Sequence, residues 1–407
     1  MTVTIIPSVL NGSITPPPSK SQAHRLLIAA ALAQGDSLIS NAAYSQDILA
    51  TLDCLEALEA VIIRKEDSVH LWGIGKPDQH GERLPKLNCR ESGSTLRFMI
   101  PVALAVAGGG RFTGSDRLME RPQGPYQKLF EEKRISFVQR PGEITVKGEL
   151  TSGTYSLAGD VSSQFVTGLL YALPLLGGAS DIILTTPLES KNYVDMTLLA
   201  LKEFGVTVQE TAQGYHIPGN QKYRPANLSV EGDYSQAGFY YAAIGLGNPI
   251  EILGLNPYSA QGDMRIVPYY LKLTGEGHVE LDVSQCPDLV PALALHAALR
   301  PGQETAIVNA ARLRMKESDR LAAVTQELNK LGAHVEEHQD HLIIHGVENL
   351  HGGTVDSHND HRIAMMLAIA ATRADGPVTI TGAESVNKSY PNFWEHYRQL
   401  GGRITVE

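Results

Sequence analysis

The sequence predicts an α/β protein with two similar domains, each built from three copies of a helix–strand module. Two observations support this prediction. A helix end followed by a β-rich run recurs six times along the 407 residues, and the copies are spaced by about 60–75 residues, which suits a compact module rather than a solenoid repeat. Six modules over this length fit two domains of ordinary size.

The six copies share an amphipathic helix end, often a small residue, and then a run rich in Val, Ile and Thr. They cover 52–63, 127–138, 198–208, 269–281, 325–335 and 395–406. Gly205, Gly332 and Gly401 follow three of these helix ends, where glycine suits a left-handed C-cap. The β-branched residues that follow favour strands. The same order is common in α/β proteins without repeats, so internal repetition is one of two interpretations.

Two segments are candidate crossings between the domains. Residues 220–238 are polar and rich in turn-forming residues, and Thr15–Pro18 is rich in proline. If the chain crosses at both, the N-terminal strand joins the C-terminal half. The prediction is a discontinuous domain of residues 1–16 plus 232–407 and an inserted domain of residues 17–231.

Composition limits the possible function. A net charge of −10 argues against partners such as nucleic acid or an anionic membrane, which call for a basic surplus. The three cysteines have no metal-binding spacing, which favours a reducing compartment. The N-terminus lacks the features of a signal peptide, and the longest apolar stretches are shorter than a membrane span. We expect a cytoplasmic protein without a membrane partner.

Several predicted helix starts combine hydroxyl groups with a cation. Ser19 or Ser21 caps the first helix, which carries Lys20 and Arg25, although a helix N-terminus disfavours cations. The other starts carry Ser92, Gly93, Ser94, Thr95 and Arg97; Ser162, Ser163 and Gln164; Ser190, Lys191 and Tyr193; Arg312, Arg314, Lys316 and Arg320, capped by Ser318 or Asp319; and His361 and Arg362, capped by Asn359 and Asp360. Free backbone N–H groups and cations form anion sites. A single such cation can simply be solvated, but their recurrence favours a ligand with several negative charges.

Two acids accompany these cations. Asp288 precedes an apolar helix and Glu317 lies between Lys316 and Arg320. Each can be a helix-capping or first-turn acid, or a carboxylate that exchanges a proton with a hydroxyl group. His358, Asp360 and His361 could ligate a metal, but the neighbouring Arg362 disfavours a cation, and we expect no metal.

Eight motifs together resemble the 5-enolpyruvylshikimate-3-phosphate synthase family. They occur in the family's order from Pro18 to beyond Lys388, as SKSQAHR, SGSTLRF, MERPQG, GDVSSQF, ESKNYVD, KESDRL, NDHRIAM and NKSYPNFW. The resemblance implies two domains of three βαβαββ units, an inside-out α/β barrel in each, and an active site in the cleft between them. It also implies transfer of the enolpyruvyl group of phosphoenolpyruvate to the 5-hydroxyl of shikimate 3-phosphate, in aromatic amino-acid biosynthesis. Neither step of that reaction needs a metal or redox cofactor, and we expect a monomer.

The resemblance also implies roles for individual residues. Ser21, Arg25, Ser162, Ser163, Ser190, Tyr193 and Lys316 would bind shikimate 3-phosphate. Gly93, Arg97, Arg121, Gln164, Arg320, His361, Arg362 and Lys388 would bind phosphoenolpyruvate or lie beside it. Lys20, Asp288 and Glu317 would be catalytic, with Asp288 as the base for the 5-hydroxyl, and Asp47 would be a further acid of the site.

Two other functions stay open at this point. One is enolpyruvyl transfer to UDP-N-acetylglucosamine, whose enzymes usually carry Asn after the first Lys and a cysteine in a mobile loop. Here Ser21 follows Lys20, and residues 112–130 contain no cysteine. The other is a non-catalytic anion-binding protein on the same scaffold, in which we would expect Lys20, Asp288 or Glu317 to be lost.

Overall fold

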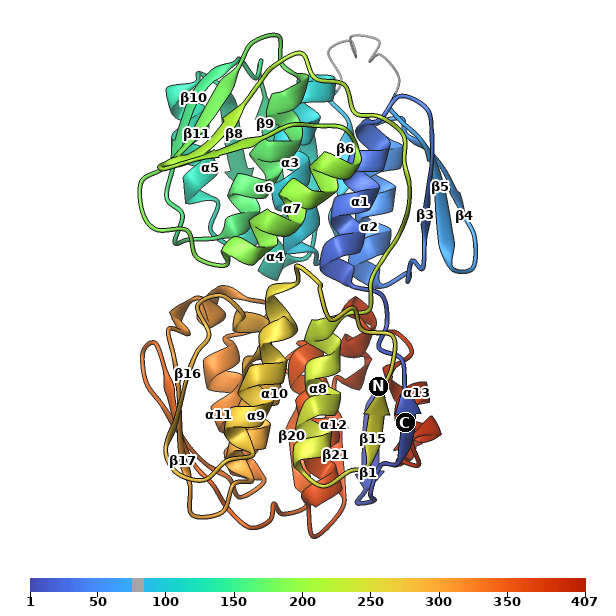
Figure 1. Cartoon of the computed structure of the whole chain (residues 1–407), viewed down its shortest axis with the longest axis vertical. Coiled ribbons are helices and arrows are strands. Elements are labelled where there is room, and N and C mark those ends of the chain that lie inside the picture. Colours follow the sequence, from blue (N-terminus) through green and yellow to red (C-terminus); the bar gives the residue numbers. More distant parts are fainter. Residues whose placement is uncertain (75–83) are drawn as a thin grey trace. The chain divides into compact units, whose positions relative to one another are not determined.

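The computed structural model describes residues 1–74 and 84–407, and the chain divides into two units (Figure 1). We call Pro18–Glu231 the inserted unit, and Met1–Pro17 together with Gly232–Glu407 the terminal unit. Each unit contains its own cluster of buried apolar side chains. A separate domain requires an apolar core of its own, and each unit has one.

The inserted unit contains three four-stranded sheets of the same topology. The strand orders are β14 (Asn227–Ser229), β3 (Asp36–Ser40), β5 (Ser68–Trp72), β4 (Val61–Arg64); β6 (Lys86–Asn88), β7 (Gly109–Thr113), β9 (Glu143–Lys147), β8 (Ser136–Arg140); and β10 (Gly153–Leu157), β11 (Ser180–Leu184), β13 (Gly214–Ile217), β12 (Gln209–Thr211). In each sheet the first pair is parallel and the other two pairs are antiparallel.

Helices connect the strands of these sheets, because two neighbouring parallel strands need a crossover connection between them. The helices are α1 (Lys20–Leu32), α2 (Gln46–Ala57), α3 (Gly93–Ala107), α4 (Asp116–Glu120), α5 (Gly124–Glu132), α6 (Ser163–Ala172) and α7 (Lys191–Glu203). Two of the three repeats therefore read βαβαββ along the chain. The first repeat takes its outer parallel strand, β14, from the far end of the unit.

The terminal unit has two sheets of the same kind. Their orders are β16 (Val279–Asp282), β17 (Glu304–Val308), β19 (Leu342–His345), β18 (His334–Glu337); and β20 (Gly353–Asp356), β21 (Val378–Thr381), β1 (Thr2–Ile6), β22 (Arg403–Val406). The helices are α8 (Tyr234–Gly245), α9 (Ile266–Leu273), α10 (Val290–Ala298), α11 (Arg320–Lys330), α12 (His361–Ala370) and α13 (Phe393–Gln399). The N-terminal strand β1 lies between β21 and β22, so both ends of the chain complete one sheet.

The third sheet of the terminal unit is shorter than the repeat predicts. Among the described residues it consists of β15 (Ile250–Ile252) and β2 (Gly12–Ile14), which pair in parallel. The copy predicted at 269–281 explains the difference, because the strand after α9 is β16, which already belongs to the next sheet. Among the described residues, this sheet therefore lacks the two antiparallel strands that each of the other five sheets contains.

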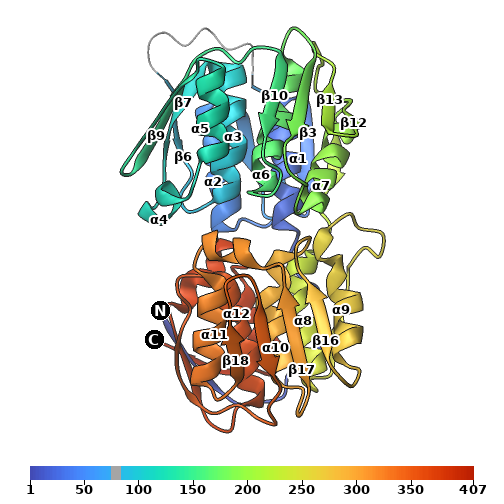
Figure 2. The same ribbon diagram turned by 90° about the vertical axis from the view of Figure 1, so that its left-hand side faces the viewer.

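The helices lie side by side in the middle of each unit, and the sheets lie outside them (Figures 1 and 2). Every residue of α10 and α12 is buried. Between their first and last turns these helices are apolar on all sides, which is the pattern of a helix surrounded by protein. The polar groups of the central helices are therefore concentrated at their ends.

The predicted glycine C-caps are confirmed. Gly205, Gly332 and Gly401 have φ values of 75°, 87° and 91° and follow α7, α11 and α13. Each allows the chain to leave its helix and turn back toward an edge strand of the sheet.

We expect Gly401→Ala to lower the free energy of unfolding by about 1–2 kcal/mol, because an L residue in the left-handed region places Cβ against the next carbonyl oxygen. The nearest atom to a Cβ at this position is 3.9 Å away, so conformation rather than a clash sets the cost. Urea unfolding followed by circular dichroism measures it.

Gly124→Ala is the matched control. Gly124 begins α5, its φ is not positive, and an added Cβ meets nothing within 4 Å. We expect this variant to unfold like the parent protein or slightly later. Equal stability of the two variants would show that the Gly401 conformation carries no cost.

Candidate functional site

Side chains cap five of the six helix starts singled out in the sequence, all except the start of α7. Ser19 accepts the N–H of Gln22, Ser92 that of Thr95 and Ser162 that of Gln164. Asp319 and Asp360 cap α11 and α12 in the same way, through the N–H groups of Ala322 and Arg362. The structure thus selects Ser19, Asp319 and Asp360 from the predicted alternatives.

In the inserted unit, Lys20 and Asp47 form an ion pair. The Nζ of Lys20, in the first turn of α1, lies 2.7 Å from Oδ2 of Asp47, in the first turn of α2. The side chains are only 14% and 11% exposed, so solvent weakens the attraction less than at an open surface. The contact ties the starts of two helices together and accounts for one cation at a helix N-terminus.

Arg25 is buried and held by neutral oxygens. Its Nε donates to Oγ1 of Thr197 at 2.9 Å, its Nη2 to the carbonyl of Tyr193 at 2.8 Å, and its Nη1 to the carbonyl of Ser21 at 2.6 Å. The guanidinium also lies over the Phe98 ring, 5.4 Å from its centroid. Burial lowers the pKa of Arg25, although Tyr171 and Tyr193 oppose the shift. Arg25 therefore connects α1 to α7 without using a carboxylate.

Arg97 and Gln164 connect α3 to α6. The Arg97 Nη1 donates to Oε1 of Gln164 at 2.8 Å, and Nε2 of Gln164 donates to Oγ of Ser94 at 3.0 Å. The Arg97 guanidinium also lies 4.9 Å from the centroid of the Phe165 ring. These contacts fix the orientation of both side chains at adjoining helix starts.

Gly93 makes room for Arg121. A Cβ on Gly93 would lie 2.7 Å from Nη1 of Arg121, closer than nonbonded atoms approach. Arg121 ends the short helix α4 and is buried. Only glycine at position 93 lets this guanidinium lie against the start of α3.

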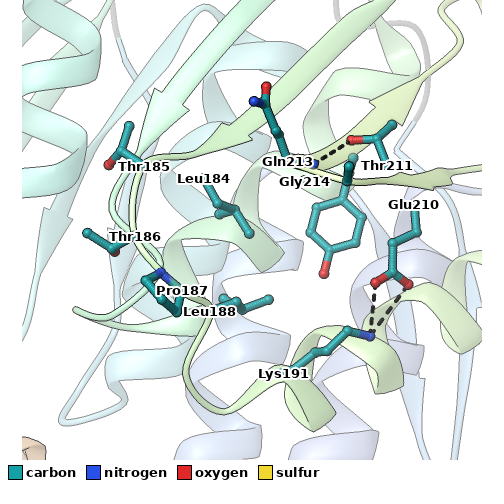
Figure 3. Close-up of a pocket in the computed structure, with 12 residues that line it drawn as sticks. Leu184, Thr185, Thr186, Pro187, Leu188, Lys191, Glu210, Thr211, Gln213 and Gly214 are labelled. Carbon is teal, nitrogen blue, oxygen red and sulfur yellow. Dashed lines mark hydrogen bonds and ion pairs between the residues drawn. The ribbon is translucent and has the colours of Figure 1, made fainter.

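Ser190 and Tyr193 lie at the start of α7. Ser190 has a φ of 54° and is buried. The next residue, Lys191, forms ion pairs with Asp195 at 2.7 Å and with Glu210 of β12 at 3.3 Å. Lys191 and Glu210 line a hollow of about 390 Å³. Figure 3 shows them at one side of it, and residues 184–188, at the end of β11 and just after it, at the other side. The ion pairs hold the first turn of α7, and with it Ser190, against the sheet.

The inserted unit thus gathers several helix starts at one end. Side-chain contacts link α1 to α2, α1 to α7, and α3 to α6, and Oγ1 of Thr51 lies 2.7 Å from Oγ1 of Thr95, linking α2 to α3. Ser162 and Ser163 lie at the start of α6 beside Gln164. Exposed N–H groups, hydroxyls and cations at one place favour binding of phosphate or carboxylate.

In the terminal unit, Arg320 contacts three carboxylates. Its Nε lies 2.7 Å from Oδ2 of Asp360, its Nη2 2.6 Å from Oε2 of Glu317, and its Nη1 2.8 Å from Oδ1 of Asp288. Arg320 is 1% exposed and Asp360 0%. Burial by itself lowers the pKa of Arg320, but the carboxylates of Asp360, Glu317 and Asp288 outweigh it and raise the pKa above its ordinary value.

Asp288 lies between three cations. Besides Arg320, Lys316 lies 3.2 Å from its Oδ1 and Arg362 lies 3.3 Å from its Oδ2. Burial lowers the pKa of Lys316, against the opposing effect of Asp288. The interpretation of Asp288 as a helix cap is wrong, because the start of α10 has no side-chain cap and Asp288 lies in the preceding 3₁₀ turn.

Lys388 and His361 lie near this group. The Nζ of Lys388 donates to the carbonyl of Asn359, next to the cap of α12, and both Lys388 and His361 are buried. His358 bonds instead to the fully buried Glu327 of α11, with Nε2 2.7 Å from Oε1. That carboxylate also accepts from Lys330 and from the backbone N–H of Asp356. Glu327 therefore holds the turn that leads into α12.

The predicted site residues divide between the units. Lys20, Ser21, Arg25, Asp47, Gly93, Arg97, Arg121, Ser162, Ser163, Gln164, Ser190 and Tyr193 belong to the inserted unit, and Asp288, Lys316, Glu317, Arg320, His361, Arg362 and Lys388 to the terminal unit. Sequence reasoning considered Asp360 as a helix cap and as a metal ligand, and did not predict its ion pair with Arg320. It missed Asp263, a buried acid near Asp288 and Arg362, because a lone Asp in a polar turn carries no signal.

No helix in the ranges 1–74 and 84–407 combines the length and the apolar character needed to span a membrane.

Comparisons with known proteins identify relatives along the whole chain. A family model described as EPSP synthase (3-phosphoshikimate 1-carboxyvinyltransferase) matches residues 5–397. The chain is 47% identical to a 3-phosphoshikimate 1-carboxyvinyltransferase of Clostridium kluyveri, over 99% of this chain and 98% of that protein. A protein of the same name from Clostridioides difficile is 43% identical over 98% and 97% of the two chains. A solved EPSP synthase from Acinetobacter baumannii has a TM-score of 0.78 and 25% identity, with both chains fully covered. These matches confirm the resemblance inferred from the motifs and the predicted fold class.

The burial of Asp263 makes stability depend on pH. Burial, together with the nearby charge of Asp288, raises the pKa of Asp263 to about 7, against the effect of Arg362. The folded protein binds this proton more tightly than the unfolded chain does. The stability that Asp263 contributes is therefore full below about pH 4 and is lost as the pH rises through about 7.

We expect Asp263→Asn to lose less free energy of unfolding than the parent between about pH 5 and about pH 8, because the amide does not ionise. Urea unfolding at both pH values measures the difference. Asp67→Asn, at an exposed position, is the control and should follow the parent. A parent-like profile for Asp263→Asn would contradict the raised pKa.

Proposed function

The chain belongs to the EPSP synthase family, and we propose that it transfers the enolpyruvyl group of phosphoenolpyruvate to the 5-hydroxyl of shikimate 3-phosphate, with release of phosphate. The observation that carries this proposal is the pair of charged clusters at helix starts, one in each unit, which retain every residue that the family resemblance calls catalytic. The same reaction places the protein in aromatic amino-acid biosynthesis.

The chemistry of the two reactants supports this assignment. Both carry a phosphate and a carboxylate, so bringing them together is opposed by their mutual repulsion. Fixed cations and helix N-termini offset this repulsion and hold the reactants in a reactive orientation. Side chains whose positions are already set by buried contacts, such as Arg25 and Arg320, lose little freedom when an anion binds.

In the inserted unit, the hydroxyls and cations at the helix starts suit the binding of anions. We assign Ser21, Arg25, Ser162, Ser163, Ser190 and Tyr193 to shikimate 3-phosphate, and Gly93, Arg97, Arg121 and Gln164 to phosphoenolpyruvate. Arg25 and Arg97 donate to carbonyl, hydroxyl and amide oxygens, which fix the orientation of both guanidinium groups. Lys20 also contacts the reactants, and Asp47 fixes its position through the ion pair.

In the terminal unit, the carboxylates suit proton transfer. We assign Asp288 as the base that accepts the proton of the 5-hydroxyl, and Lys316 as its neighbour on shikimate 3-phosphate. Glu317 handles the proton at the methylene carbon. Arg320, His361, Arg362 and Lys388 bind phosphoenolpyruvate. Positive neighbours stabilise a carboxylate in the ionised form that can accept a proton, and Asp288 and Glu317 both lie beside Arg320.

The proposed reaction has an addition and an elimination. The 5-hydroxyl oxygen bonds to C2 of phosphoenolpyruvate as its proton leaves to Asp288, and the methylene carbon gains a proton, which gives a tetrahedral intermediate. That carbon then loses a proton while the bond from C2 to the phosphate oxygen breaks. Phosphate leaves, and the enol ether remains. No electron is gained or lost in either step.

We also propose that the inserted and terminal units correspond to the two predicted folding domains, and that the enzyme acts as a monomer in the cytoplasm. The chain passes between the units at Pro17–Pro18 and at Glu231–Gly232. Both points fall in the turn-rich segments that suggested the domain boundaries.

We expect Asp288→Asn and Glu317→Gln to bind both substrates but to reduce kcat at least about 10²-fold, because each removes a proton acceptor and keeps the shape of the side chain. Phosphate release from phosphoenolpyruvate with shikimate 3-phosphate measures turnover, and calorimetry measures binding. Glu348→Gln, at an exposed position, is the control. Near-normal turnover of either variant would refute its assigned role, and phosphate release only with UDP-N-acetylglucosamine would refute the proposed substrate.

We expect Gly93→Ala to raise the KM for phosphoenolpyruvate at least about 10-fold and to change the KM for shikimate 3-phosphate much less. The methyl group would overlap Nη1 of Arg121 and displace a residue assigned to phosphoenolpyruvate. Gly124→Ala, which has open space around its Cβ, should leave both values unchanged. An equal rise in the two KM values would show that Arg121 does not bind phosphoenolpyruvate in particular.

A further inference from the structure

Histidines and glutamates gather on the exposed face of the sheet β16–β17–β19–β18 in the terminal unit. His334 of β18 pairs directly with His345 of β19, and His345 pairs directly with Glu304 of β17. Glu336 lies two residues after His334 on the same strand and therefore on the same face. Val335, between them, points to the other face and is buried. The face thus presents imidazole and carboxylate groups from three neighbouring strands.

Three of these side chains converge on one point. The Nε2 of His345 lies 3.3 Å from Oε1 of Glu336, and the Nε2 of His334 lies 3.6 Å from the same oxygen. One donor atom from each of His334, Glu336 and His345 lies within 4.8 Å of the other two. The imidazole rings of His334 and His345 have their centroids 4.6 Å apart.

These separations match the coordination shell of a small divalent ion. Zinc binds imidazole nitrogen and carboxylate oxygen at about 2.0–2.2 Å in tetrahedral geometry, which places neighbouring ligand atoms about 3.3–3.6 Å apart. The separations of Oε1 of Glu336 from the Nε2 atoms of His345 and His334 both fall in this range. The ligand set of two histidines and one glutamate is also the set that catalytic zinc sites use, with a fourth position left to water.

Glu304 occupies the position of an outer-shell partner. Its Oε2 lies 3.6 Å from Nδ1 of His345, the ring nitrogen that does not face Glu336, and its Oε1 lies 3.0 Å from Nδ1 of His278. A carboxylate behind a histidine ligand fixes the ring and its tautomer, so that the other nitrogen is left free to coordinate. Exposed histidine and glutamate residues also occur together as simple charge pairs. A charge pair does not require two histidine nitrogens to face one carboxylate oxygen while a second carboxylate lies behind one of the rings.

We propose that His334, Glu336 and His345 bind one divalent transition-metal ion of the zinc class, with Glu304 orienting His345. Nitrogen ligands of this kind favour zinc, nickel or copper over magnesium and calcium, which prefer oxygen. The ion would link β18 to β19 and so stabilise the hairpin at the edge of the sheet. None of its residues belongs to the cluster around Arg320, and it takes no part in the proposed transfer reaction, so the two proposals stand or fall separately.

Zinc binding to the full-length protein tests the proposal. After treatment with a chelator and its removal, titration with zinc chloride followed by calorimetry should show one saturable site. The melting temperature should rise with zinc, because a ligand that binds only the folded protein stabilises it. Cobalt(II) bound at the same site should give the visible absorption bands of tetrahedral coordination. Magnesium chloride should produce none of these effects.

Variants distinguish this site from general surface binding. His345→Ala and Glu336→Gln should each weaken zinc binding at least about tenfold, and Glu304→Gln should weaken it about tenfold through the orientation of His345. His351→Ala removes an exposed histidine that pairs with Asp375 elsewhere on the unit, and it should bind zinc like the parent. All variants should keep the parent's turnover. Absence of a saturable site, or equal zinc binding by the parent and His345→Ala, would overturn the proposal.

Discussion

The pairing of Arg320 with Asp288, Glu317 and Asp360 is the constraint on which the terminal unit depends. A buried guanidinium is costly unless carboxylates compensate it, and removing one partner of such a group commonly costs about 3–5 kcal/mol. The three carboxylates come from the segments before α10, α11 and α12. Satisfying one charge therefore fixes the starts of three central helices relative to one another, and the side chains around them take their positions from that arrangement.

In the inserted unit, two guanidinium groups bond to neutral acceptors, whereas Lys20 forms an ion pair with Asp47. Arg25 and Arg97 donate to carbonyl, hydroxyl and amide oxygens and lie over aromatic rings. These neutral acceptors satisfy hydrogen bonds, and the hydroxyls and cations at the helix starts of this unit favour anions. The carboxylates around Arg320 give the terminal unit a more balanced cluster, which suits proton exchange. The two clusters thus differ in chemistry although they are built on the same repeat.

Much of this arrangement could be predicted from the sequence, because its signals are local. Glycines after helix ends and hydroxyl or acidic caps before apolar runs depend on neighbouring residues only, and Gly205, Gly332, Ser92 and Asp319 take the predicted places. The short sheet of β15 and β2 could not be predicted, since a helix–strand pattern does not tell which sheet the strand joins. The burial of Asp263 and the three partners of Arg320 depend on residues distant in the chain. The sequence likewise suggests a helix cap at Asp288, because the cations that contact it are distant in the chain.

The position of β1 has a consequence for synthesis of the chain. β1 leaves the ribosome long before β21 and β22, the two strands with which it pairs. The inserted unit is continuous, and its two ends meet where the N–H of Ser19 bonds to the carbonyl of Glu231. Because domains generally fold as units during translation, this unit can complete its core before β1 has its partners β21 and β22. Residues 2–6 therefore stay unpaired until β21 and β22 have been made, and their exposed edge must be kept from aggregating during that time.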